Sequence, residues 1–177
     1  MNIKRLISGV LLAIWISTSS ADVTLKPFQE NSLQQITDDR KNQPFLLLLW
    51  SIDCPPCLKE LAQLQQLHNQ FSASSLVLVS TDDVQIADSV EKTIKDFQLE
   101  KLDNWIFSES IPERLRYAID PAWYGELPRA YFYDASHQRK PHSGSLNTVT
   151  LNKWLNKTRD YLSSETFSNP ALNVVKK

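Results

Sequence analysis

A pair of cysteines two residues apart follows a short apolar segment and precedes a helical pattern. Residues 45–50 (FLLLLW) form a continuous apolar run, which is typical of a strand buried on both faces. Beyond Cys54-Pro-Pro-Cys57, Leu and Phe recur at spacings of three and four, which predicts an amphipathic helix over 57–71. The sequence therefore places the first cysteine where a buried strand turns into a helix.

The chain has no other cysteine, so the pair is free to alternate between a disulfide and a dithiol. It can thus carry two electrons without a further cofactor. An inert structural bridge is the less favoured alternative, because closing so short a loop removes little chain entropy. Zinc normally needs four ligands, and His68, His137 and His142 are scattered, so we expect neither a metal nor a cofactor.

The N-terminal residues have the pattern of a secretory signal peptide. Lys4 and Arg5 precede an apolar stretch at 6–16, and small residues at 19–21 fit a cleavage site, so we assign 1–21 as the signal. The apolar stretch is too short to span a bilayer, which needs about 20 residues. An uncleaved N-terminal membrane anchor is the alternative. Both interpretations of the N-terminal segment predict that the remaining domain lies in the periplasm, an oxidising compartment.

Composition and length limit the partners and the domain organisation of the chain after residue 21. Removing residues 1–21 takes away two basic residues and leaves 17 basic and 20 acidic ones, which argues against a nucleic-acid partner. The remaining length suits one domain with a single core, predicted over 22–162, and 163–177 is expected to be a C-terminal tail. We expect a monomer.

Further patterns complete an α/β chain. A second buried strand at 76–79 gives a strand–helix–strand unit, which by default is parallel and right-handed. The other expected elements are a strand or extended segment at 23–28, a turn at 38–40, a helix capped by Asp82-Asp83 and ending near 97, a strand at 105–107, a helix opened by a capping box at Ser110 and ending at 117, strands at 129–133 and near 139–145, and a last helix from 151 to 162.

The position of the pair predicts different roles for its two sulfurs. Free N–H groups and the helix dipole at a helix N-terminus favour a thiolate at Cys54, while Cys57, one turn further on, would resolve the mixed disulfide. Pro55 and Pro56 remove two backbone donors, and Asp53 adds negative charge beside the thiolate. Since no histidine lies between the cysteines, as it does in the strong oxidant DsbA, we predict a reductant or a mid-potential exchanger.

The residues alone leave the roles of three other features undecided. Glu60 is either a dipole partner or surface acid near the helix start, or a proton acceptor for the resolving thiol. The Leu127-Pro128 bond precedes a strand, and most such bonds are trans. For Trp123-Tyr124, packing in the core or in a loop is favoured over a place at the rim of a substrate-binding site.

Taken together, these motifs resemble the thioredoxin fold. The resemblance rests on the motifs WSIDCPPC at 50–57 and GELPRAYFYD at 125–134, and it covers about residues 40–160. The secreted context and Glu60 are most similar to TlpA/ResA-type periplasmic thiol–disulfide oxidoreductases. The resemblance implies a central mixed sheet flanked by helices, with the CxxC pair at the N-terminus of the first main helix.

The resemblance also implies roles for the matching residues. Cys54 would be the nucleophile, Cys57 the resolving cysteine and Glu60 a catalytic acid, with Trp50 packed under the site. Pro128 would be cis beside the disulfide, and the backbone of Leu127 would pair with an extended substrate segment. Pro55 and Pro56 would complete the substrate-binding surface.

The sequence departs from the family pattern at three positions. Asp53 stands where a second Trp is usual, Leu48 where thioredoxin has a buried acid, and Ala62 where a Pro often follows the Glu60-Leu61 pair. The surface around Cys54 is therefore more acidic, and proton transfer depends on Glu60 or water.

The leading hypothesis is a periplasmic enzyme that reduces or exchanges disulfides in protein partners. Apocytochrome c is one possible substrate. A membrane electron donor would recycle the enzyme. One alternative is a Cu(I)-binding metallochaperone-like module, because thiolates suit Cu(I). Another is a non-catalytic thioredoxin-like binding protein that uses the Leu127-Pro128 groove.

Overall fold

A computed structural model of the chain describes residues 23–67, 70 and 75–168. The predicted signal peptide, His68 and residues 169–177 lie outside these ranges. Within them, no helix combines the length and the apolar character needed to cross a bilayer.

The described chain contains six strands and five α-helices, which alternate except that β6 follows β5 directly. The elements, in order, are β1 (Leu25–Phe28), α1 (Ser32–Asp38), β2 (Phe45–Trp50), α2 (Pro55–Leu67), β3 (Leu76–Ser80), the short 3₁₀ helix η2 (Val84–Ile86), α3 (Ala87–Asp96), β4 (Asp103–Phe107), α4 (Pro112–Ile119), β5 (Arg129–Tyr133), β6 (Arg139–Ser143) and α5 (Thr148–Ser168).

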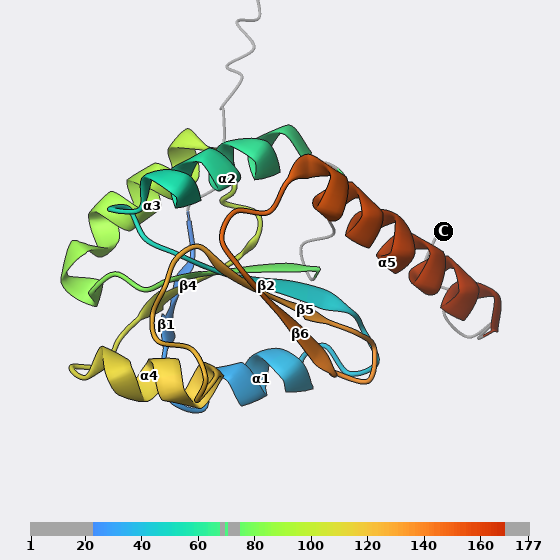
Figure 1. The fold of residues 1–177 in the computed structure, drawn as a ribbon, viewed down its shortest axis with the longest axis horizontal. Coiled ribbons are helices and arrows are strands. Elements are labelled where there is room, and N and C mark those ends of the chain that lie inside the picture. The colour runs from blue at the N-terminus through green and yellow to red at the C-terminus, as the bar shows by residue number, and fades with distance from the viewer. Residues whose placement is uncertain (1–22, 68–69, 71–74, 169–177) are drawn as a thin grey trace, which may run out of the picture.

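The strands form one mixed sheet in the order β1-β4-β3-β2-β5-β6. Strands β1 to β4 are mutually parallel, whereas β5 runs antiparallel to β2 and β6 antiparallel to β5. In Figure 1, α2, α3 and α5 lie on one face of the sheet and α1 and α4 on the other. This is the mixed α/β architecture expected from the resemblance to thioredoxin.

Strand β2 is central, and its successive side chains enter two different cores. Leu46, Leu48 and Trp50 belong to a cluster that includes Cys57 and the apolar faces of α2, α3 and α5. Phe45, Leu47 and Leu49 belong to a second cluster against α1 and α4. All six residues are buried, which explains why the strand is continuously apolar rather than alternating.

The sequence located most elements, but some predictions need correction. Helix α2 begins at Pro55 rather than 57, and α5 runs from Thr148 to Ser168, beyond the predicted end at 162. Helix α1 was not predicted. The expected capping box at Ser110 is wrong, because the N-cap of α4 is Ile111 and makes no side-chain cap.

Candidate functional site

Cys54 and Cys57 form a disulfide at the N-terminus of α2, with an S–S distance of 2.11 Å. The carbonyl of Cys54 accepts the N–H of Leu58 at 3.1 Å, which is the first bond of the helix. Its Sγ accepts the N–H of Cys57 at 3.2 Å. Cys54 therefore occupies the N-cap position, and its sulfur takes the place of the usual capping oxygen.

The two sulfurs differ in accessibility. Cys57 is fully buried, at 0% exposure, whereas Cys54 is partly exposed. A sulfur in another protein can thus reach Cys54 but not Cys57. This asymmetry matches the division into an attacking and a resolving cysteine.

The prolines between the cysteines limit the donors near Cys54. Pro55 and Pro56 are the first two helical residues, both exposed, and neither has an N–H. The N–H of Cys57 is therefore the first backbone donor after Cys54, and it is the one bonded to the sulfur. One donor remains to stabilise a thiolate there.

A buried carboxylate from the neighbouring strand fixes the turn before the cysteines. Asp82 follows β3 and accepts hydrogen bonds from the Ser51 hydroxyl at 2.7 Å, the Ile52 N–H at 3.1 Å and the Ser80 hydroxyl at 2.6 Å. The predicted capping of the helix that ends near 97 is wrong, because the N-cap of α3 is Ile86 and makes no side-chain cap, while Asp83 caps the short η2 that precedes it. Sequence reasoning missed this role of Asp82, although its position directly after a buried parallel strand is a usable signal.

Glu60 lies one helical turn after Cys57 and is buried, with 1% of its surface exposed. One carboxylate oxygen accepts the N–H of Leu146 at 2.8 Å, and the other has no hydrogen-bond partner among the described residues. Burial raises the pKa of Glu60 to about 7, although the Leu146 N–H acts in the opposite direction. The surface-acid interpretation is therefore wrong, and this carboxyl group can exchange a proton near neutral pH.

The Leu127-Pro128 peptide bond is cis. Arg129, the next residue, pairs with Leu49 in the sheet, so Pro128 lies beside the end of β2, where the chain turns toward Cys54. The Pro128 carbonyl is already bonded to the N–H of Gly144. Leu127 itself is half-buried, and its N–H and C=O make no hydrogen bond to the described residues.

Trp50 is the last residue of β2 and is almost completely buried. It shares a hydrophobic cluster with Cys57, and Cys54 and Leu127 pack against that same cluster. Trp50 therefore supports the site from beneath, while Cys54, Pro55, Pro56 and Leu127 form the part accessible from outside.

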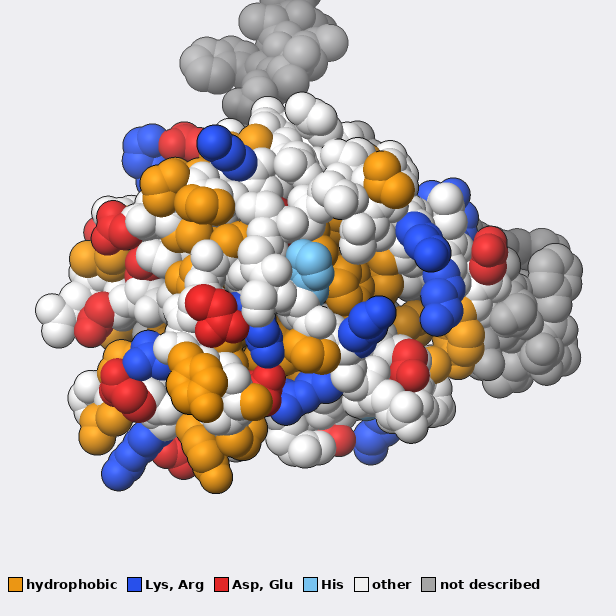
Figure 2. Space-filling view, viewed as in Figure 1, with side chains coloured by type: hydrophobic (Ala, Val, Ile, Leu, Met, Phe, Trp, Pro, Cys, Tyr) orange, Lys and Arg blue, Asp and Glu red, His pale blue; other side chains and the backbone are white. Residues whose placement is uncertain are grey.

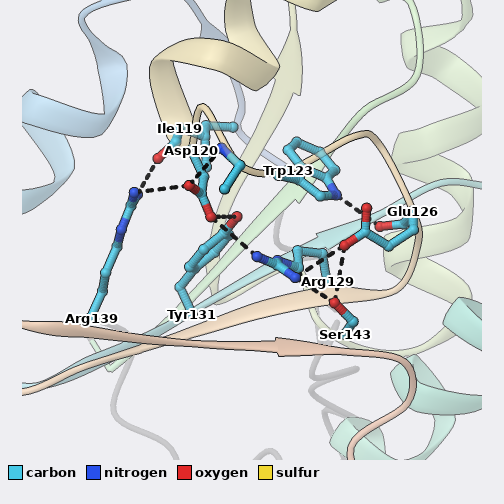
Figure 3. Close-up of polar contacts among 9 residues, drawn as sticks. Ile119, Asp120, Trp123, Glu126, Arg129, Tyr131, Arg139 and Ser143 are labelled. Atoms are coloured by element: carbon cyan, nitrogen blue, oxygen red, sulfur yellow. Dashed lines mark hydrogen bonds and ion pairs between the residues drawn. The ribbon is translucent and has the colours of Figure 1, made fainter.

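The loop at residues 120–128, which leads to the cis-proline, is anchored by a buried network of charged residues (Figure 3). Asp120 accepts hydrogen bonds from Arg129 at 3.1 Å, the Tyr131 hydroxyl at 2.9 Å and the Ala122 N–H at 3.1 Å, and pairs with Arg139. Burial alone would raise the pKa of Asp120, but these donors and cations hold it below its usual value. Sequence reasoning missed this network, because its members are separated along the chain.

Two prominent surface hollows on the described chain, of about 430 and 450 Å³, lie away from the cysteine pair, and neither cysteine lines them. In the view of Figure 2, hydrophobic side chains reach the surface among Asp, Glu, Lys and Arg side chains. Over the described residues, no group of three or more His, Cys, Asp or Glu side chains could hold a metal ion.

Comparisons with solved structures support the fold. A secreted disulfide oxidoreductase from Mycobacterium tuberculosis, homologous to E. coli DsbE, is 15% identical with a TM-score of 0.53, covering 68% of this chain and 85% of that one. A Chlorobium tepidum thiol:disulfide interchange protein is 17% identical with a TM-score of 0.54, covering 79% and 99%. A DsbF homologue from Corynebacterium diphtheriae is 17% identical with a TM-score of 0.53, covering 68% and 74%.

These identities are low, so the similarities establish the thioredoxin-like fold alone. No curated protein matches the sequence significantly. A family model does match, over residues 17–123, which include β1 to α4 and the cysteine pair. The chain therefore belongs to the AhpC/TSA family of thioredoxin-like proteins.

Proposed function

We propose that the protein is a periplasmic thiol–disulfide oxidoreductase of the TlpA/ResA type that reduces or exchanges disulfides in partner proteins. The observation that carries this proposal is the asymmetric cysteine pair. Cys54 caps a helix with its sulfur and is accessible, while Cys57 is buried directly behind it. That arrangement suits two consecutive exchange steps.

In the first step, the Cys54 thiolate attacks one sulfur of a partner disulfide. A mixed disulfide forms, and the partner's other sulfur leaves as a thiolate. In the second step, the sulfur of Cys57, deprotonated by Glu60, attacks Cys54 and releases the partner's remaining sulfur. The Cys54–Cys57 disulfide forms, the partner gains two electrons, and its two thiolates take up one proton returned by Glu60 and one from water.

Recycling needs a source of two electrons outside this chain. We propose a membrane thiol donor, which would reduce the disulfide by the same exchange in reverse. The predicted signal peptide at 1–21 supports a periplasmic location. Apocytochrome c is one possible substrate, because it carries paired cysteines that must be reduced before haem attachment.

The partner is expected to bind in an extended conformation. The unpaired N–H and C=O of Leu127 lie next to Pro128 at the end of β2, where they can hydrogen-bond a strand-like segment. This places the partner's backbone beside Cys54.

The proposal is tested by reduction of insulin disulfides by the purified protein in the presence of a thiol donor. The wild-type chain should catalyse the reduction, and Cys54→Ser should abolish it. Equal rates for wild type and Cys54→Ser would support a non-catalytic binding protein instead. Tight 1:1 binding of Cu(I) by the reduced protein, without insulin reduction, would support the metal-binding alternative.

A further inference from the structure

The loop at residues 120–128, which we call the docking loop, joins α4 to β5 and is anchored at both ends. At its start, Asp120 binds the guanidinium of Arg129 at 3.1 Å (Figure 3). Both residues are buried, and Arg129 is the residue that follows the cis-proline. One ion pair therefore ties the beginning of the loop to its end.

Further bonds fix the middle of the loop. The buried indole of Trp123 donates to the carbonyl of Glu126 at 2.9 Å, and the Glu126 carboxylate pairs with Arg129 at 3.0 Å and accepts the Ser143 hydroxyl at 3.0 Å. Gly125 has a φ of +98°, where other residues are strained. These constraints hold the backbone of the docking loop in one conformation.

This fixed loop exposes one large aromatic side chain. Tyr124 is 91% exposed, although its neighbour Trp123 is 4% exposed and packs in the core. The loop also carries Leu127, whose backbone groups make no hydrogen bond to the described residues and which packs against the same cluster as Cys54. Tyrosine on a rigid loop is well suited to recognition, because its large contact area costs little conformational entropy.

We propose that the docking loop is a preassembled recognition surface for a protein partner, in which Tyr124 contacts an apolar side chain near the partner's reacting cysteine. The network of Asp120, Arg129 and Glu126 positions this surface and takes no part in the exchange chemistry. The occupant is an extended segment of a disulfide-bonded protein, so the inference rests on the proposed function. It adds the residue that selects protein partners over small disulfides.

The primary test compares Tyr124→Ala with Tyr117→Ala. Tyr117 is also exposed, at 69%, but lies on α4 beside Glu30, which follows the edge strand β1. We expect Tyr124→Ala to raise KM for insulin about tenfold with kcat within about twofold, and to leave the rate with 2-hydroxyethyl disulfide unchanged. Tyr117→Ala should match the wild type with both substrates.

Equal KM values for the two tyrosine variants would overturn the inference. So would a parallel loss of activity toward insulin and 2-hydroxyethyl disulfide in Tyr124→Ala, because a recognition residue should not affect the small substrate. If the wild-type protein fails to reduce insulin at all, the proposed function itself fails, which is a separate outcome.

The positioning network is tested with Glu126→Gln, which removes an exposed charge and keeps a hydrogen-bonding group. Asp96→Asn, in the exposed Lys92–Asp96 pair of α3, is the matched control. We expect Glu126→Gln to raise KM for insulin about threefold to tenfold without changing kcat or the rate with 2-hydroxyethyl disulfide. An unchanged KM, with thermal unfolding equal to that of the control, would contradict a positioning role.

Discussion

At the scale of single residues, Glu60 has the most unusual environment in the site. Its carboxyl group is buried on α2, one turn after Cys57, and among the described residues only the Leu146 N–H binds it. Burial raises its pKa to about 7, so it carries a proton over a pH range in which ordinary carboxyl groups have lost theirs. This makes Glu60 a suitable proton acceptor for Cys57 at neutral pH.

The raised pKa predicts that Glu60 makes folding less favourable as pH increases. Between pH 4.5 and about 7, the unfolded chain has lost the Glu60 proton and the folded chain retains it, so stability falls with rising pH. We expect Glu60→Gln to gain about 3 kcal/mol over the wild type by pH 8, relative to their difference at pH 4. Denaturant unfolding across this range measures the effect.

Glu113→Gln is the control for this experiment, because Glu113 forms an exposed pair with Arg116 and contributes little. Its stability should follow the wild-type pH dependence. Parallel curves for the wild type and Glu60→Gln would show that Glu60 titrates normally. In the same variant, the second exchange step should slow and lose any inflection near pH 7.

At the scale of elements, the site depends on how neighbouring loops are joined at the carboxyl ends of β2 and β3. Asp82 reaches from the loop after β3 to bind Ser51 and Ile52, directly before the cysteines. The Thr81 N–H also donates to the Trp50 carbonyl at 2.9 Å. The turn that presents Cys54 is therefore held by the adjacent strand.

Replacing Asp82 with Ala should destabilise the protein by about 3 kcal/mol, because it leaves the part-buried Ile52 N–H and two hydroxyl groups, one of them buried, without their charged acceptor. Asp83→Ala removes only the cap of η2 and should cost about 1 kcal/mol. Chemical unfolding of both variants provides the comparison. Equal losses would show that Asp82 does not anchor the turn.

The elements differ in how well their sequences predict them. Strand β2 and helix α2 carry strong local patterns, so they could be located to within a few residues. Helix α1 was missed because it has only Leu33 and Ile36 facing the core. The capping box at Ser110 failed because the chain enters α4 through Ile111, with Pro112 as the first helical residue.

The residues of the site also differ in how well the sequence predicts their positions and contacts. The cysteine pair is contiguous in sequence, so its position and the different burial of its sulfurs followed from the helix start. The Glu60–Leu146 contact spans 86 residues, and the partners of Asp120 come from two later strands. Such contacts depend on how the sheet is assembled, and no local pattern indicates them.

At the scale of the whole molecule, the cysteine pair links the stability of the fold to its redox state. The Cys54 sulfur receives one backbone donor, that of Cys57, and Asp53 adds a negative charge nearby. The reduced form therefore gains less from its thiolate than in strong oxidants, whose reduced forms are the more stable. A reductant should show the opposite order of stabilities.

We expect a reduction potential well below the value of about −120 mV for DsbA and closer to the value of about −270 mV for thioredoxin. The reduced protein should also unfold at a lower denaturant concentration than the oxidised protein. Equilibration with dithiothreitol, followed by tryptophan fluorescence, measures the potential. Pro56→His should raise the potential, because a cation between the cysteines stabilises the thiolate. A wild-type value near that of DsbA would contradict the prediction of a reductant or a mid-potential exchanger.

The central claim, that Cys54 attacks a partner disulfide and Cys57 resolves the intermediate, is tested most directly by trapping. Reduced Cys57→Ser is mixed with a protein disulfide such as insulin, and the products are mapped by mass spectrometry. We predict a mixed disulfide at Cys54 that accumulates and is released by added reductant, and none with Cys54→Ser. No adduct with Cys57→Ser, or an equal amount through Cys57 in Cys54→Ser, would contradict the mechanism.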